Sequence, residues 1–284
     1  PTPSPKICVH PGSSAVFTSS RIEPAPPAWS GAQNSNGGGD SGLIRLAPRP
    51  LSRHSPAVRI LLLILALTAT GAVSAQNREH VILCGGPALR QWENLRVKNE
   101  RHDNWWANFI RASTLRMDEL TRAYGQNARI VWIVNRPGYI LRGKEDSKPY
   151  TTWVQEVATK RKVTLVWVDS GPAAIRALNA RPTRSVATFD FFGHSNRHCF
   201  MLDYGSEIMA VSKAWIHEDE LGKIRRGVFT SDALCQSYGC HTGESMSQVW
   251  KRKVGNTLIG AQGKTDYAVI SKGRLPSVSG RWIR

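Results

Sequence analysis

The chain has few cysteines, and none of them form a CxxC pair. Five occur in 284 residues, and four of these, Cys84, Cys199, Cys235 and Cys240, lie beyond residue 75. Four cysteines are sparse for a disulfide scaffold of this size, although one bridge remains open in an exported protein. Cysteine usage therefore argues against a small fold that depends on disulfides.

Acidic residues are also scarce: 21 Asp and Glu stand against 38 Lys and Arg, for a formal net charge of +17. Such an excess favours anionic partners, among them cell-envelope components, nucleic acid and acidic proteins. The basic residues are scattered, however, with only short runs such as 160–162 and 251–253. We therefore expect a mainly solvated basic surface, with anionic cell-envelope components as candidate partners and no specific nucleic-acid binding.

Residues 1–57 have no apolar periodicity and are rich in Pro, Ser, Gly and Arg. Such a composition cannot bury a core. The chain begins with Pro1, and its first methionine is Met117. We expect this stretch to be either a disordered leader or a mis-annotated start.

The next segment, residues 58–75, has the pattern of a secretory signal peptide. Arg59 supplies a positive charge, residues 60–67 form an apolar run, and Ala75 ends a small-residue cleavage site. The apolar run is short for a membrane span. We therefore predict a secreted or periplasmic protein, with an uncleaved membrane anchor as the alternative. Cleavage would leave a single domain, residues 76–284, which is long enough to bury a core.

Patterns typical of strands and helices alternate beyond the leader, and no internal repeat is found. Strands are expected at 80–86, 128–138, 162–171, 185–193, 228–239 and 256–263. Helices are expected at 105–125, 150–161, 172–181, 214–227 and 243–255, a polar loop at 142–149 and part of a hairpin at 198–205. This alternation predicts an α/β fold, a three-layer sandwich with a mostly parallel central sheet covered on both faces.

Two of the predicted strands end on a reactive side chain beside glycine, His194 in one case and Cys240 in the other. In open parallel sheets the chemistry lies at the carboxyl ends of the strands. If the two strands are neighbours, the imidazole and the thiol can form a base and a nucleophile. A helix that begins soon after Cys240 would also favour its thiolate.

The glycines around Cys240 suit the same chemistry. Gly239 and Gly243 keep the turn unobstructed, so backbone N–H groups can face a developing oxyanion. Residue types alone leave another interpretation open, a buried structural cysteine and an unrelated loop histidine.

The arrangement resembles clan CD of the cysteine peptidases, which contains the caspases, legumains, gingipains, separases and CHAT-domain peptidases. In that group one apolar strand ends in His-Gly or Gly-His, and a later apolar strand ends in a small residue followed by Cys. The catalytic cysteine commonly lies in a turn of a small residue, Cys, two further residues and Gly, which YGCHTG (238–243) resembles. His194 and Cys240 are 46 residues apart, and caspases have a spacing of about 50. The resemblance covers residues 80–270 as architecture, but only 189–196 and 235–263 as motif.

This resemblance implies a caspase-like fold and an endopeptidase that acts on proteins or peptides, with no metal or organic cofactor. It implies His194 as the base and Cys240 as the nucleophile, with the Cys240 amide and one near His194 as the oxyanion hole. Many members place glycine after the histidine, whereas here Gly193 precedes it and Ser195 follows. The local turn can therefore differ.

No motif matches the specificity pocket of that group. Asp190 and Glu244 flank the reactive pair and are candidates for recognising a basic side chain of the substrate. Local capping or ion pairing is the competing explanation for both.

Three other chemistries are open. GHSNR (193–197) resembles the elbow G-x-S-x-G, with Ser195 as a hydrolase nucleophile, but Arg197 replaces the last glycine. A disulfide between Cys235 and Cys240 would abolish the nucleophile. Candidate zinc ligands, at spacings unlike familiar zinc motifs, are His194, His198, Cys199, Cys235, Cys240 and His241.

A non-enzymatic interpretation also stands: an inactive caspase-like protein that binds a cell-envelope partner through a basic, tryptophan-rich surface. Most tryptophans lie at periodic positions, so we expect them in the core: Trp92, Trp105, Trp106, Trp132, Trp153 and Trp167. The thiol separates the two interpretations, since an easily alkylated Cys240 favours an enzyme and an inert one favours a binder.

Overall fold

The structure is a computed structural model that describes residues 78–98, 101, 103–204 and 212–284. These residues all belong to one compact unit. The predicted leader and signal peptide lie outside the described residues, so both stay predictions. Within the described part, no helix combines the length and the apolar character needed to cross a membrane.

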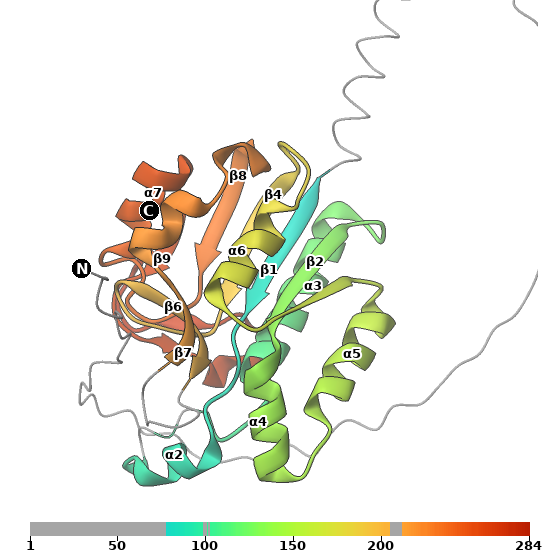
Figure 1. The fold of residues 1–284 in the computed structure, drawn as a ribbon, viewed down its shortest axis with the longest axis vertical. Coiled ribbons are helices and arrows are strands. Elements are labelled where there is room, and N and C mark those ends of the chain that lie inside the picture. Colours follow the sequence, from blue (N-terminus) through green and yellow to red (C-terminus); the bar gives the residue numbers. More distant parts are fainter. Residues whose placement is uncertain (1–77, 99–100, 102, 205–211) are drawn as a thin grey trace, which may run out of the picture. The chain divides into compact units, whose positions relative to one another are not determined.

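A seven-stranded sheet forms the centre, in the order β12-β9-β8-β4-β1-β2-β3 (Figure 1). Its strands are β1 (Glu79–Cys84), β2 (Arg129–Asn135), β3 (Thr164–Val168), β4 (Val186–Phe192), β8 (Phe229–Ser237), β9 (Leu258–Ala261) and β12 (Trp282–Ile283). Neighbours pair in parallel except β9 with β12, which is antiparallel. The predicted α/β class with a mostly parallel sheet is confirmed.

Helices cover both faces of this sheet. The α-helices of the described residues are α2 (Arg90–Leu95), α3 (Asn108–Tyr124), α4 (Arg136–Asp146), α5 (Tyr150–Arg161), α6 (Gly171–Asn179) and α7 (Met246–Val254), of which α2 lies beyond the strand ends and not on a face (Figure 1). Along β1, Val81 and Leu83 pack in one core cluster with α6 and α7. Ile82 and Cys84 pack in a second cluster with α3 and α5. Side chains of a strand point to opposite faces in turn, so β1 is buried on both sides.

The polar loop predicted at 142–149 is wrong for its first residues, because helix α4 continues as far as Asp146. The chain continues from β2 directly into a helix, and the Asn135 side chain caps it by accepting from the Gly138 amide at 3.0 Å. Pro137 is tolerated because it lies in the first turn. The sequence predicts a loop here because a buried helical position normally carries an apolar residue. This helix instead buries the charged Arg142 completely.

The predicted helix at 214–227 is wrong. Ser212–His217 forms strand β7, whose residues alternate between buried and more exposed positions. Two short 3-10 helices, Glu218–Lys223 and Arg226–Val228, follow it. Strand β7 pairs with β6 (Cys199–Tyr204), which also pairs with β5 (His194–Ser195). The hairpin predicted around 198–205 is therefore real as far as Tyr204.

The tryptophans divide between core and surface. Trp132 is fully buried, whereas Trp105 is 44% exposed and the other four expected core tryptophans are partly buried. The expectation of a tryptophan-filled core is therefore wrong for Trp105.

The strand order reverses direction at the centre of the sheet. From β1 the chain adds β2 and β3 on one side, and then β4, β8 and β9 on the other. Open parallel sheets bind their ligands at such a reversal, outside the carboxyl ends of the strands. The ends of β1 and β4, and of β8 beside them, are thus the natural place to look for a site.

Candidate functional site

The structure brings His194 and Cys240 to the same edge of the sheet. His194 lies just beyond the end of β4 and Cys240 just beyond the end of β8. Because β4 and β8 are parallel neighbours, their carboxyl ends lie side by side. The two predicted residues therefore lie at one edge of the sheet, beyond adjacent strand ends.

Direct contacts join the two strand ends. The Ser195 hydroxyl donates to the Cys240 carbonyl at 2.7 Å. Among the described residues, no hydrogen bond links the His194 ring to the Cys240 sulfur. Ser195 itself is 1% exposed and lies in β5, without the helix that a hydrolase elbow needs. The geometry therefore does not support Ser195 as a nucleophile.

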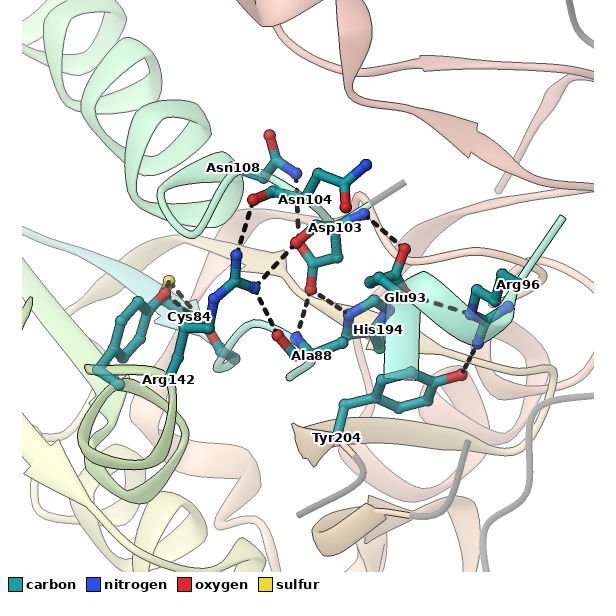
Figure 2. A network of polar contacts seen from close by, with 12 residues as sticks. Cys84, Ala88, Glu93, Arg96, Asp103, Asn104, Asn108, Arg142, His194 and Tyr204 are labelled. Carbon is teal, nitrogen blue, oxygen red and sulfur yellow. Dashed lines mark hydrogen bonds and ion pairs between the residues drawn. The ribbon is translucent and has the colours of Figure 1, made fainter. Parts of the chain in front are cut away.

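A carboxylate that the sequence did not reveal holds the histidine. The Nε2 atom of His194 lies 2.9 Å from Oδ2 of Asp103, and both side chains are buried (Figure 2). The same carboxylate accepts from the Ala88 amide and from the Asn108 side chain, the latter at 3.2 Å. Asp103 therefore fixes the ring through one nitrogen while its own position is fixed by two donors.

A second layer of contacts surrounds this pair (Figure 2). Glu93, fully buried, accepts from the Asp103 amide at 3.1 Å and forms an ion pair with Arg96 at 3.1 Å. Arg96 donates to the Tyr204 hydroxyl at 2.8 Å, and the Tyr204 ring stacks on His194 with centroids 4.1 Å apart. Burial raises the pKa of Glu93, and the charge of Asp103 raises it further. The imidazole of His194 is therefore held by the Asp103 carboxylate at its edge and by the Tyr204 ring on its face.

The loop that carries Asp103 is fastened to α4. The buried guanidinium of Arg142 donates to the carbonyls of Ala88, Asp103 and Asn104 at 2.7, 3.0 and 2.7 Å. The same group pairs with Asp146 at 2.7 Å. A helix that we predicted as loop thus supplies the rigid support for the histidine's partner.

The sulfur of Cys240 contacts a segment that follows β9. It accepts from the Thr265 amide at 3.3 Å and lies 3.3 Å from the Thr265 hydroxyl. Two residues further, the Tyr267 hydroxyl donates to the Tyr238 carbonyl at 3.1 Å. Burial raises the pKa of Tyr267 well above its usual range, and the nearby Cys240 adds to this effect.

The turn at Cys240 contains two backbone amides that differ in their hydrogen bonding. His241 adopts a left-handed conformation with φ of 62°, and its amide donates to the Gly263 carbonyl at 2.8 Å. The Cys240 amide, in contrast, donates to no acceptor within the part of the chain described. Such a donor suits an oxyanion.

Both specificity candidates are engaged in ion pairs. Asp190 is 1% exposed and accepts from Arg116 at 2.9 Å, so a substrate does not reach it. Glu244 contacts His241 at 2.7 Å and Arg197 at 3.0 Å. Ion pairing therefore occupies both residues, but it is local in the sequence only for Glu244 with His241, because Arg116 is 74 residues from Asp190.

The remaining cysteine chemistry is simple. Cys84, Cys235 and Cys240 are free, so the Cys235–Cys240 disulfide is not formed. Burial raises the pKa of Cys84 to about 11 and that of Cys235 still higher, whereas Cys240 is partly exposed. Over the described ranges, no group of three or more His, Cys, Asp or Glu side chains is arranged to hold a metal ion.

Replacing Gly239 with alanine tests how closely the two strand ends fit. A Cβ there would lie 2.2 Å from Oγ and 2.8 Å from Cβ of Ser195. We expect a loss of about 1–3 kcal/mol in the free energy of unfolding, as for other overpacked sites. The matched control is Gly227→Ala, whose Cβ would have no atom within 4 Å. Equal stability of the two variants, measured by urea denaturation, would contradict the close contact.

Signals for the missed residues were weak. Asp103 precedes a predicted helix and has no motif around it, and Thr265 lies in the polar stretch after a predicted strand. Both meet their partners only through the fold.

Comparisons with known proteins identify no relative. The scan against protein-family models finds no matching model, and neither the search of curated proteins nor that of solved structures finds a match. The function is therefore inferred from the geometry of the site.

Proposed function

We propose that this chain is an exported cysteine endopeptidase-like hydrolase related to clan CD, with a caspase-like version of the α/β sandwich. Cys240 is the nucleophile and His194 the base. The observation that carries the proposal is the parallel pairing of β4 with β8, which sets the imidazole and the thiol at one sheet edge. The hydrogen bond from Ser195 to the Cys240 carbonyl supports the same proximity.

The proposed reaction has two halves. In the first, His194 takes the thiol proton, and the sulfur of Cys240 bonds to the carbonyl carbon of the peptide. The carbonyl oxygen becomes negative and faces the Cys240 amide. The C–N bond then breaks, and the amine leaves with the proton from His194. In the second half, water hydrolyses the thioester, which releases the acid and restores the thiol.

Asp103 gives the histidine its orientation in this scheme. Because Nε2 contacts Asp103, the proposal gives the proton exchange with sulfur to Nδ1. A carboxylate beside an imidazole also stabilises the imidazolium that forms during the reaction. The residue therefore completes a Cys–His–Asp arrangement.

An inactive binding protein is the second candidate. The observation that favours it is the lack of a hydrogen bond between His194 and Cys240 in the described structure. Catalytic hydrogen bonds are often long without substrate, so this observation does not exclude an enzyme.

Alkylation near neutral pH, followed by peptide mass mapping, separates the two candidates. We expect iodoacetamide to label Cys240 faster than Cys84 and Cys235, because both of these are buried with raised pKa values. His194→Ala should slow the labelling of Cys240 roughly tenfold for each unit by which its pKa rises, and leave the other two unchanged. Equal, slow labelling of all three thiols in both proteins would favour the binding protein.

A further inference from the structure

The segment between β9 and the 3-10 helix Ala268–Lys272 received no role from the sequence, yet it lines the turn of the nucleophile. Its alternate residues each contact that turn. Gly263 accepts from the His241 amide at 2.8 Å, and Tyr267 donates to the Tyr238 carbonyl at 3.1 Å. Between them, Thr265 contacts the reactive sulfur itself.

The chemistry of the Thr265 contacts favours a negatively charged sulfur. A backbone N–H can only donate, so the sulfur is the acceptor of the bond at 3.3 Å. The hydroxyl, also at 3.3 Å, can donate to a thiolate or accept from a thiol. A thiolate therefore finds two donors in one residue. Hydrogen bonds to the charged form of an acid lower its pKa.

A hairpin fixes these donors in place. Strand β10 (Thr265–Asp266) pairs with β11 (Ser277–Val278), with Thr265 opposite Val278. Beyond this pair, the Ser279 hydroxyl accepts from the Lys264 amide at 2.9 Å, and the Ser279 amide donates to the Lys264 carbonyl at 2.8 Å. The backbone around Thr265 is thus held by pairing and hydrogen bonds with the neighbouring strand. Fixed donors need no rearrangement when charge develops on the sulfur.

We infer that Thr265 is a catalytic residue that stabilises Cys240 as a thiolate through its amide and its hydroxyl, and that the β10–β11 hairpin holds it there. The proton that leaves the sulfur goes to His194, so no further reactant is needed. The inference rests on the proposed function, since that function makes Cys240 the nucleophile.

Thr265→Val is the direct test, because it replaces the hydroxyl with a methyl group of similar shape and keeps the amide. The rate of Cys240 alkylation by iodoacetamide is measured across the pH range in which thiols ionise. We expect the midpoint to rise by about one pH unit, so that labelling below the midpoint falls about tenfold while the plateau at high pH is unchanged. Thr265→Ser, which keeps a hydroxyl, should retain the midpoint of the unmodified protein. If the valine variant does not fold, Thr265→Ala removes the hydroxyl in its place.

Ser279→Ala is the matched control, because it removes one side-chain hydrogen bond of the same hairpin, keeps the β10–β11 backbone pairing and does not touch the sulfur. Its midpoint should rise much less than that of Thr265→Val. An equal rise in Ser279→Ala and Thr265→Val would assign the effect to the hairpin and overturn the role of the hydroxyl. An unchanged or lowered midpoint in Thr265→Val would overturn it too. Since the assay reads the sulfur and not hydrolysis, a raised midpoint in a protein that cleaves no peptide would support Thr265 and count against the peptidase alone.

Discussion

Asp103→Asn is expected to slow peptide hydrolysis by between about a hundredfold and ten-thousandfold. An amide keeps the shape of the side chain but carries no charge, so it does not stabilise an imidazolium. Its NH2 group also favours the wrong tautomer of His194, whose Nε2 now lies 2.9 Å from a carboxylate oxygen. The loss should therefore lie in turnover more than in substrate binding.

The measurement is the release of new amino termini from a denatured protein pool, with Cys240→Ala defining zero. Asp118→Asn is a matched control, because it is an acid of α3 that is partly exposed and pairs with Arg161. This control should cleave at the rate of the unmodified protein. Thermal denaturation of both variants shows whether a loss of rate is a loss of folded protein. Full turnover in a folded Asp103→Asn variant would remove Asp103 from the proposed site.

Arg116→Met is expected to lower the free energy of unfolding by about 3–5 kcal/mol, because it leaves a buried charge without its partner. Asp190 is 1% exposed, and its Oδ2 lies 2.9 Å from Nε of Arg116. Burial raises the pKa of Asp190 to about 6, and Arg116 holds it below the value that burial alone would give. The methionine fills similar space but offers no charge.

The pH dependence of this loss has a defined sign. The pKa of Asp190 in the folded protein, about 6, lies above the usual value for an unfolded chain, about 3.9. The folded state therefore holds this proton more tightly, and the contribution of Asp190 to stability is lost as the pH rises from about 4 through 6. Without Arg116 the pKa rises further, so the deficit of Arg116→Met should be larger at neutral pH than at pH values below about 4.

Urea denaturation at the two pH values measures this effect. Arg161→Met is the matched control, since it breaks a more exposed pair with Asp118 and should cost less than about 1 kcal/mol. Asp190→Asn in the Arg116→Met background removes the stranded charge and should recover part of the loss. An Arg116→Met variant as stable as the Arg161→Met control at neutral pH would show that the buried pair contributes little.

The sequence predicted a helix or strand correctly where the spacing of its apolar residues matches only one kind of element. The helix predicted at 150–161 is α5, residue for residue, because its buried positions Tyr150, Val154 and Ala158 follow the helical period. The segment 214–227 failed because its apolar residues also fit a short strand, and pairing with β6 decided the matter. Helix α4 failed because its buried Arg142 satisfies its charge through contacts made only in the folded chain.

By itself the sequence determined the sheet class and the two strands that end on His194 and Cys240, because the period of two and the runs of apolar residues are local properties. Only the tertiary structure decided which strands are neighbours and which groups reach the reactive pair. Asp103 is 91 residues from His194, and Thr265 is 25 residues from Cys240. Contacts across such separations arise from the order of strands in the sheet and the path of its loops, and no pattern within either segment encodes them.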